Sequence, residues 1–201
     1  MMILRSVSAS PFGRKTRIGA ALCGLADRIT LENADTNDPM DSVRAQNPLG
    51  KIPVLILDDG TAIYDSRVIL ECFDELAGGG RILPRGGMER IAAQRLHALC
   101  DGILDASILL IYEGRWRTKE KHEARWIEHQ AGKVSRALAF LEAAPPAFQP
   151  MLHVGHITLA CALGYQDFRF EGRWRAAYPN LVGWLDEFAW KVPAFAETTP
   201  Q

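Results

Sequence analysis

Ser10 and Pro11 are the first residues in the chain whose types and spacing could support chemistry. Proline is tolerated in the first turn of a helix, so Pro11 predicts a helix start and places Ser10 at its N-cap. Unpaired N–H groups and the helix dipole favour an anion at this position, and a serine hydroxyl could donate to it. The alternative is a plain N-cap that only stabilises the helix.

The loop 47–54 is the second candidate, with the sequence NPLGKIPV. Two prolines and a glycine give such a loop a defined shape, and Pro53 is a candidate for a cis peptide bond. Pro53 also stands where an apolar strand should begin, a strand position that tolerates a missing N–H. Such a turn leaves backbone N–H and C=O groups free for an extended ligand. The alternative is an ordinary tight loop.

The metal-ligating residue types give a weaker pattern. His153 and His156 have the i, i+3 spacing that could bind a metal, but the sequence offers no evident third ligand, so we expect none. The cysteines are widely spaced and form no C-x-x-C pair: Cys23, Cys72, Cys100 and Cys161. Three of them lie in apolar helical patterns, which favours buried thiols in a reducing cytoplasm over disulfides.

The elements that must position these residues change in kind along the chain. Up to residue 77 the pattern predicts a mixture of strands and helices, with strands at 2–7, 28–32, 54–57 and 61–64 and helices after Ser10 and at Asp65-Ser66. A glycine-rich linker, 78–87, follows. Every later segment is predicted to be helical: about 88–112, about 119–143, 156–168 and a last helix after Pro179. We therefore predict an α+β domain at 1–77 and an all-helical domain at 88–201.

Composition excludes several classes of partner. The 201 residues are 48% hydrophobic and 23% charged, as in soluble globular proteins. A net charge of −1 gives no long-range attraction to nucleic acid or an anionic membrane. No apolar run approaches the roughly 20 residues of a membrane span, and the start of the chain is too quickly polar for a signal peptide. We expect a cytoplasmic protein.

Taken together, the motifs resemble the glutathione transferase superfamily over essentially the whole chain, and in particular bacterial members with a serine-type active-site turn. The resemblance rests on five stretches: Ser10-Pro11-Phe12-Gly13-Arg14, the loop 47–54, Asp65-Ser66, the segment 152–168, and Tyr178-Pro179-Asn180-Leu181 followed by Trp184 and Val192-Pro193-Ala194-Phe195. The resemblance implies a thioredoxin-like N-terminal domain, an all-α C-terminal domain and a homodimer. Glutathione would be bound as a substrate beside the cis-proline, with no metal.

The resemblance also implies roles for individual residues. Ser10 would donate to the glutathione thiolate, with Ser8 as the rival. Because serine replaces cysteine before Pro11, no mixed disulfide can form there, which favours conjugation over redox exchange. The glutathione-binding residues would be Ser66 for the γ-glutamyl carboxylate, Asp65 for the ammonium, Val54 beside Pro53 for the backbone, and Lys51 for the glycyl carboxylate.

The second substrate would bind between the two domains, with candidate lining residues Phe12, Leu109, Tyr112 and Trp116; ordinary packing is the alternative for each. Arg14 is expected at the surface or an interface. A basic stretch at 115–121 favours a solvated helix junction, with an anionic second substrate as the alternative. One departure from the family pattern is that His153 and His156 stand where a capping box of Ser or Thr and Asp is usual.

Two hypotheses from different classes follow. The first is an enzyme of detoxification type that activates the glutathione thiol for attack on a small hydrophobic electrophile. The second is a transferase-like binding or regulatory module without activity, since this fold hosts both. A glutathione-dependent isomerase or dehalogenase is a narrower option on the same site. The sequence does not name the electrophile or the subclass.

Overall fold

A four-stranded sheet forms the centre of the N-terminal domain in the computed structural model, which describes residues 1–200. The strands are β1 (Met2–Ser6), β2 (Ile29–Asn33), β3 (Val54–Ile56) and β4 (Ala62–Ile63), in the order β2-β1-β3-β4. β1 pairs parallel to β2, with Leu4 opposite Leu31, and antiparallel to β3, with Leu4 opposite Leu55. The four predicted strands are found within one or two residues at each end.

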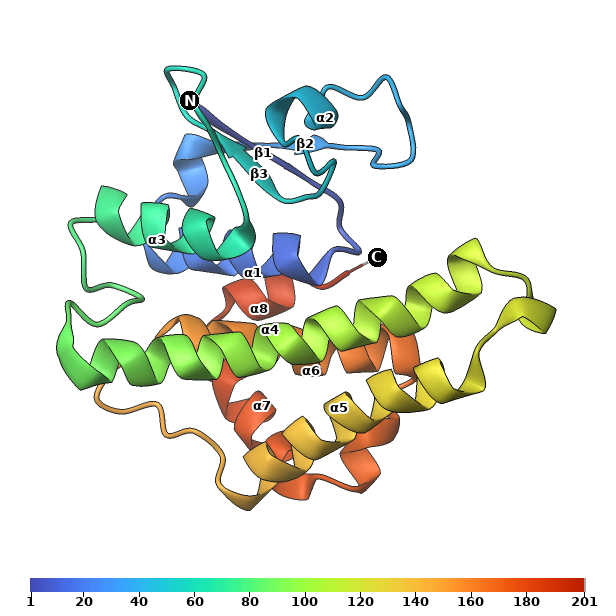
Figure 1. Cartoon of the computed structure of the whole chain (residues 1–201). Helices are drawn as coiled ribbons and strands as arrows, with labels where there is room; N and C mark the ends of the chain where they lie inside the picture. The colour runs from blue at the N-terminus through green and yellow to red at the C-terminus, as the bar shows by residue number, and fades with distance from the viewer. Residues whose placement is uncertain (201) are drawn as a thin grey trace.

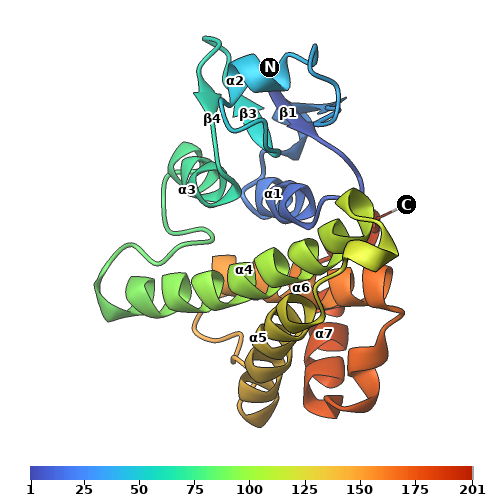
Figure 2. The ribbon, with the colours of Figure 1, turned by 45° about the vertical axis from the view of Figure 1, so that its right-hand side comes forward.

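Helices cover both faces of this sheet. α1 (Pro11–Leu22) and α3 (Ser66–Leu76) lie between the sheet and the helical domain, as Figure 1 and Figure 2 show. They pack closely because Gly19 has no side chain: a Cβ there would stand 2.1 Å from Cδ2 of Leu70. The short helix α2 (Val43–Gln46) buries Val43 against a smaller apolar cluster that includes Val54. The start of β3 therefore lies between packed side chains.

The C-terminal domain is all-helical. Its helices are α4 (Gly87–Trp116), α5 (Ala124–Ala143), α6 (Val154–Phe170), α7 (Pro179–Lys191) and α8 (Ala194–Glu197). Every residue of α6 from Val154 to Gln166 is buried, which confirms the predicted central helix. α4 lies along α6, and α1 also packs on α6, above these two helices in Figure 2. No helix within residues 1–200 is long and apolar enough to span a membrane.

Two predicted helix boundaries are wrong. α4 extends to Trp116 instead of about 112, and α5 begins at Ala124 instead of about 119. Between them Lys119–Lys121 forms a 3-10 turn, and a carboxylate oxygen of Glu113 accepts a hydrogen bond from the backbone N–H of Glu123 at 3.1 Å. A side chain from the preceding helix thus fixes the entry to α5, which local sequence does not reveal.

Arg14 was expected at the surface or an interface; it is buried at the interface between the two domains and is not at the surface. Its side chain is 4% exposed and lies with its guanidinium carbon 4.0 Å from the ring centre of Phe195. Its Nη2 donates to the carbonyl of Phe195 at 2.6 Å, and its Nε donates to Oγ1 of Thr198 at 3.3 Å. The guanidinium therefore ties α1 to the end of the helical domain.

Candidate active site

A cavity of about 490 Å³ lies between the two domains. The N-terminal domain contributes the start of α1 and the loop before β3, and the helical domain contributes the last turns of α4 and α6. Its walls include Val7, Ala9, Ser10, Pro11, Phe12, Gly50, Lys51 and Ile52 on one side and Asp105, Ile108, Leu109, Tyr112, Arg115, Tyr165 and Arg169 on the other. The cavity thus has a polar N-terminal wall, an apolar middle and a basic helical wall.

Ser10 stands at the N-cap of α1, as the sequence predicted. Its Oγ accepts a hydrogen bond from the backbone N–H of Gly13 at 3.1 Å, which leaves the hydroxyl proton available for a ligand. Gly13 has no room for a side chain, because a Cβ there would stand 1.8 Å from Oγ of Ser6. Ser10 lines the cavity and Ser8 does not, so the geometry favours Ser10 over its rival.

The loop before β3 is held by Asn47. The side chain of Asn47 donates to the carbonyl of Lys51 at 2.9 Å and accepts from the N–H of Leu49 at 3.1 Å. The Ile52–Pro53 peptide bond is cis. These contacts bring Lys51 and Ile52 into the same N-terminal wall of the cavity as Ser10, whereas Pro53 and Val54 are buried and do not line it.

The start of α3 carries the other two predicted glutathione-binding residues. Asp65 is the N-cap and accepts a hydrogen bond from the N–H of Arg67 at 2.9 Å, so the capping role falls to Asp65 and not to Ser66. Ser66 is the first residue of the helix and is 3% exposed. Neither residue lines the 490 Å³ cavity, so the structure places them outside its immediate wall.

A buried charged cluster of Lys15, His97 and Asp101 joins α1 to α4. Nζ of Lys15 donates to Oδ1 of Asp101 at 2.6 Å and to Nε2 of His97 at 3.0 Å. Because Nε2 accepts from an ammonium, His97 is neutral and carries its proton on Nδ1. Burial, together with the Lys15 charge, lowers the pKa of His97 to about 2. Arg67 completes the cluster, with Nε 3.4 Å from Asp101 and 3.5 Å from Asp65.

Three of the four predicted second-substrate residues line the cavity: Phe12, Leu109 and Tyr112. Trp116 does not. It is the last residue of α4, one turn beyond Tyr112, and its side chain is 66% exposed. The prediction that Trp116 lines the cavity is not met, although the preceding residue, Arg115, does line it.

Sequence reasoning missed several lining residues, of which Tyr165 and Arg169 are the most informative. They are four residues apart and therefore share a face of α6, and the guanidinium of Arg169 interacts with the Tyr165 hydroxyl. Arg115 was assigned to a solvated helix junction, yet it lines the cavity from α4. The i, i+4 spacing of Tyr165 and Arg169 is the only feature of the sequence that could have indicated that they share a wall of the cavity.

His153 and His156 cap α6 with neutral imidazoles. Nδ1 of His153 accepts from the N–H of Gly155 at 3.2 Å, and Nδ1 of His156 accepts from the N–H of His153 at 3.1 Å. Nε2 of His156 then donates to the carbonyl of Ala147 at 3.0 Å. The pair replaces the usual Ser or Thr and Asp with the same reciprocal geometry. Within residues 1–200 no group of three or more potential ligands is arranged for a metal.

Comparison with known proteins places the chain in a family. Residues 9–76 match the N-terminal domain of glutathione S-transferases, and residues 124–187 match the C-terminal domain of glutathione S-transferases. The uncharacterized GST-like protein YibF of Escherichia coli K12 is 31% identical over 198 residues, which cover 95% of each chain. The chain therefore belongs to the glutathione transferase family.

Solved structures agree in fold over the full length. A glutathione transferase family member from Pseudomonas fluorescens Pf-5, crystallised with bound glutathione, is 38% identical and has a TM-score of 0.92 with complete coverage of both chains. A second structure from the same organism holds S-(propanoic acid)-glutathione, with 38% identity, a TM-score of 0.87 and 100% coverage of both chains. The thioredoxin-like and all-helical domains predicted from the sequence are those of this family.

Proposed function

We propose that this protein is a glutathione transferase in which Ser10 activates the glutathione thiol for attack on a small electrophile. The observation that carries the proposal is the Ser10 hydroxyl, which lines the interdomain cavity while its oxygen already accepts from Gly13. The hydroxyl proton is thus available to donate to a ligand at the N-terminus of α1. A free thiol has a pKa near 8.5, and donation to the sulfur favours the thiolate, which is the nucleophile.

Glutathione would extend from Ser10 along the cis-proline loop to the start of α3. In this arrangement Lys51 pairs with the glycyl carboxylate, and the backbone of Val54 pairs with the cysteinyl residue as in strand addition. The hydroxyl of Ser66 and the first turn of α3 bind the γ-glutamyl carboxylate, and Asp65 binds the ammonium. The relatives solved with glutathione and with S-(propanoic acid)-glutathione support a thiol-conjugation site.

Titration calorimetry with glutathione tests this proposal, beside the variants Ser10→Ala and Ser66→Ala. We expect Ser10→Ala to bind glutathione within about threefold of the wild type and Ser66→Ala to bind at least tenfold more weakly. Because a catalytic hydrogen-bond donor contributes about 10²–10³ in rate, turnover of a generic aromatic halide should fall about 100-fold in Ser10→Ala. The ultraviolet absorbance of the bound thiolate should disappear in that variant.

The matched control is Ser8→Ala, which should keep both the thiolate signal and the turnover. If the thiolate absorbance were lost in Ser8→Ala and retained in Ser10→Ala, Ser8 and not Ser10 would be the donor to the thiolate. Wild-type protein that does not bind millimolar glutathione would exclude the transferase and leave a binding module of this fold.

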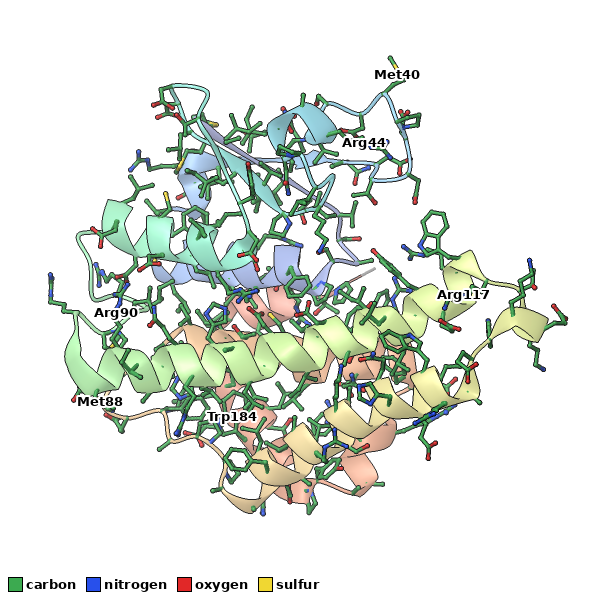
Figure 3. The ribbon with its side chains drawn as sticks, viewed as in Figure 1. Met40, Arg44, Met88, Arg90, Arg117 and Trp184 are labelled. Atoms are coloured by element: carbon green, nitrogen blue, oxygen red, sulfur yellow. The ribbon has the colours of Figure 1, made fainter. Side chains whose placement is uncertain are left out.

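We further propose a homodimer formed through α3 and the start of α4. Apolar side chains are exposed on these adjacent segments: Val68 is 48% exposed, Ile91 is 53% and Met88 is 77%. An ion pair between Glu71 and Arg90 joins the two helices at this surface, and Figure 3 shows Met88 and Arg90 at the start of α4. A second copy would cover these side chains.

Light scattering after size exclusion tests the assembly. We expect a dimer for the wild type and a monomer for Ile91→Glu, because a carboxylate would be buried in the contact. Phe140→Glu, which changes a side chain 67% exposed on α5, is the control and should remain dimeric. A monomeric wild type at micromolar concentration would exclude this interface.

A further inference from the structure

Arg115 and Arg169 place two positive charges on the helical wall of the cavity. Both side chains line it, one from the last turn of α4 and one from the last turn of α6. Neither forms an ion pair with a carboxylate of residues 1–200, whereas nearby arginines do: Arg117 pairs with Glu113, and Arg175 pairs with Asp167 at 2.7 Å. Figure 3 shows Arg117 at the far end of α4. Arg115 and Arg169 thus differ from these nearby arginines, because no carboxylate of the described residues forms an ion pair with them.

These guanidinium groups are held in place without a neutralising partner. The guanidinium carbon of Arg169 lies 4.2 Å from the ring centre of Phe168, and that of Arg115 lies 5.1 Å from the ring centre of Tyr112. Nε of Arg169 is buried and has no hydrogen-bond acceptor among the described residues. A buried hydrogen-bond donor without an acceptor is uncommon and costs free energy. A ligand that supplied an acceptor to Arg169 would remove that cost.

The side chains of the cavity wall carry more positive than negative charge. The lining contains Lys51, Arg115 and Arg169 but only one carboxylate, that of Asp105. In the proposed binding mode the two carboxylates of glutathione are taken by Lys51 and by the start of α3. Neither Arg115 nor Arg169 is assigned to a group of glutathione in this mode, so both guanidinium groups are available to a second substrate.

We propose that the second substrate carries a carboxylate, which Arg115 and Arg169 bind. This inference rests on the proposed function, because the other end of the substrate must meet the thiolate at Ser10. Phe12, Ile108 and Leu109 line the cavity beside these groups and suit a short apolar segment. The substrate is thus a small electrophilic carboxylic acid with its reactive carbon in the apolar middle. Guanidinium groups suit this role because their paired N–H groups match carboxylate geometry.

The charges would also assist the reaction of an α,β-unsaturated carboxylate. The thiolate sulfur forms a bond to the β-carbon, and the π electron pair of the double bond moves onto the α-carbon and the carboxylate. A proton from solvent then bonds to the α-carbon, while the thiol proton has already left to solvent, so the sum is addition of S–H across the double bond. Two guanidinium charges stabilise the additional negative charge in the transition state.

Titration calorimetry with two glutathione thioethers of the same shape tests the proposal. S-(2-carboxyethyl)glutathione carries the carboxylate, and S-(2-carbamoylethyl)glutathione carries a neutral amide in its place. We expect the wild type to bind the carboxylate compound at least tenfold more tightly. Arg115→Gln and Arg169→Gln should each reduce that preference, and the double variant should abolish it. Arg169→Lys should retain part of it, and affinity for glutathione itself should change by less than twofold.

Arg125→Gln, which changes an exposed side chain on α5 outside the cavity, is the control and should leave the preference intact. Equal binding of the two thioethers by the wild type would overturn the proposal even if a variant does not fold. Weaker binding of glutathione itself in the arginine variants would assign these residues to glutathione and also overturn it. Absence of glutathione binding by the wild type would instead refute the proposed function.

Discussion

At the scale of single residues, the buried cluster of Lys15, His97 and Asp101 shows how this chain fixes α1 to α4. Lys15 is fully buried, and its ammonium contacts both partners at hydrogen-bond distance. Oδ2 of Asp101 lies 3.3 Å from Nε2 of His97, but both atoms are acceptors when the proton of His97 is on Nδ1, so no hydrogen bond forms between them. The exposed guanidinium of Arg67 is the remaining charge near that oxygen. Lys15 is therefore the member of the cluster that forms hydrogen bonds to both of the others.

Lys15→Met should therefore destabilise the protein strongly. Removing one partner of a buried ion pair leaves the other charge uncompensated, and we expect the free energy of unfolding to fall by about 3–4 kcal/mol. Lys15→Met/Asp101→Leu should recover at least half of that loss, because no buried carboxylate then remains. Urea denaturation followed by circular dichroism measures both values. A single variant as stable as the wild type would show that Asp101 is neutral in the folded protein.

At the scale of elements, the histidine cap of α6 makes the helical domain sensitive to acid. His156 must be neutral, because its Nδ1 accepts from the N–H of His153 while its Nε2 donates to Ala147. Burial lowers the pKa of His156 to about 4, against about 6.5 in an unfolded chain. Between these values the unfolded state binds the proton and the folded state does not, so stability decreases as the pH falls through this window.

We expect the contribution of His156 to reduce the free energy of unfolding by about 1 kcal/mol between pH 6.5 and 5.5. Thermal melts across this range measure the slope. The control is His153→Ser/His156→Asp, which restores the usual capping box and removes both imidazoles. Because burial also lowers the pKa of His153, its slope over the same range should be smaller by at least that amount. Equal slopes for the two proteins would show that His156 titrates normally.

The elements with local signals were predicted well, and those fixed by distant contacts were not. Pro11 and Ser10 define the start of α1 by themselves, since a proline in the first turn and a serine cap need no other segment. The start of α5 could not be predicted, because the Glu113 carboxylate of α4 accepts the N–H of Glu123. The start of α3 was predicted at Asp65-Ser66 and is found there, with Asp65 as the N-cap and Ser66 as the first helical residue.

At the scale of the whole molecule, the active-site cavity belongs to neither domain alone. Ser10 and Lys51 could be identified from sequence because each lies in a motif of its own segment. Arg115, Tyr165 and Arg169 could not, because α4 and α6 present them to the cavity only after packing on each other and on α1. The basic wall therefore depends on how α1 is seated on the helical domain, which makes that contact a functional feature as well as a structural one.

Arg14 holds this contact, and its replacement should weaken the coupling of the two domains. Its guanidinium occupies the space left by Gly164 of α6, where a Cβ would stand 2.5 Å from Nη1, and donates to the carbonyl of Phe195. Arg14→Met leaves that carbonyl without its donor, so we expect a loss of about 2 kcal/mol in the free energy of unfolding.

Two probes separate the domains in this experiment. All five tryptophans follow residue 115, so their fluorescence reports on the helical domain, while Cys23, whose thiol pKa burial raises to about 12, reports on the N-terminal domain. In the wild type, fluorescence and thiol labelling of Cys23 should change together with urea. In Arg14→Met, labelling of Cys23 should precede the fluorescence change, whereas Arg125→Met, on the exposed side of α5, should keep them coincident. Coincident transitions in Arg14→Met at the wild-type midpoint would mean that packing of α1 on α6 couples the domains without the guanidinium.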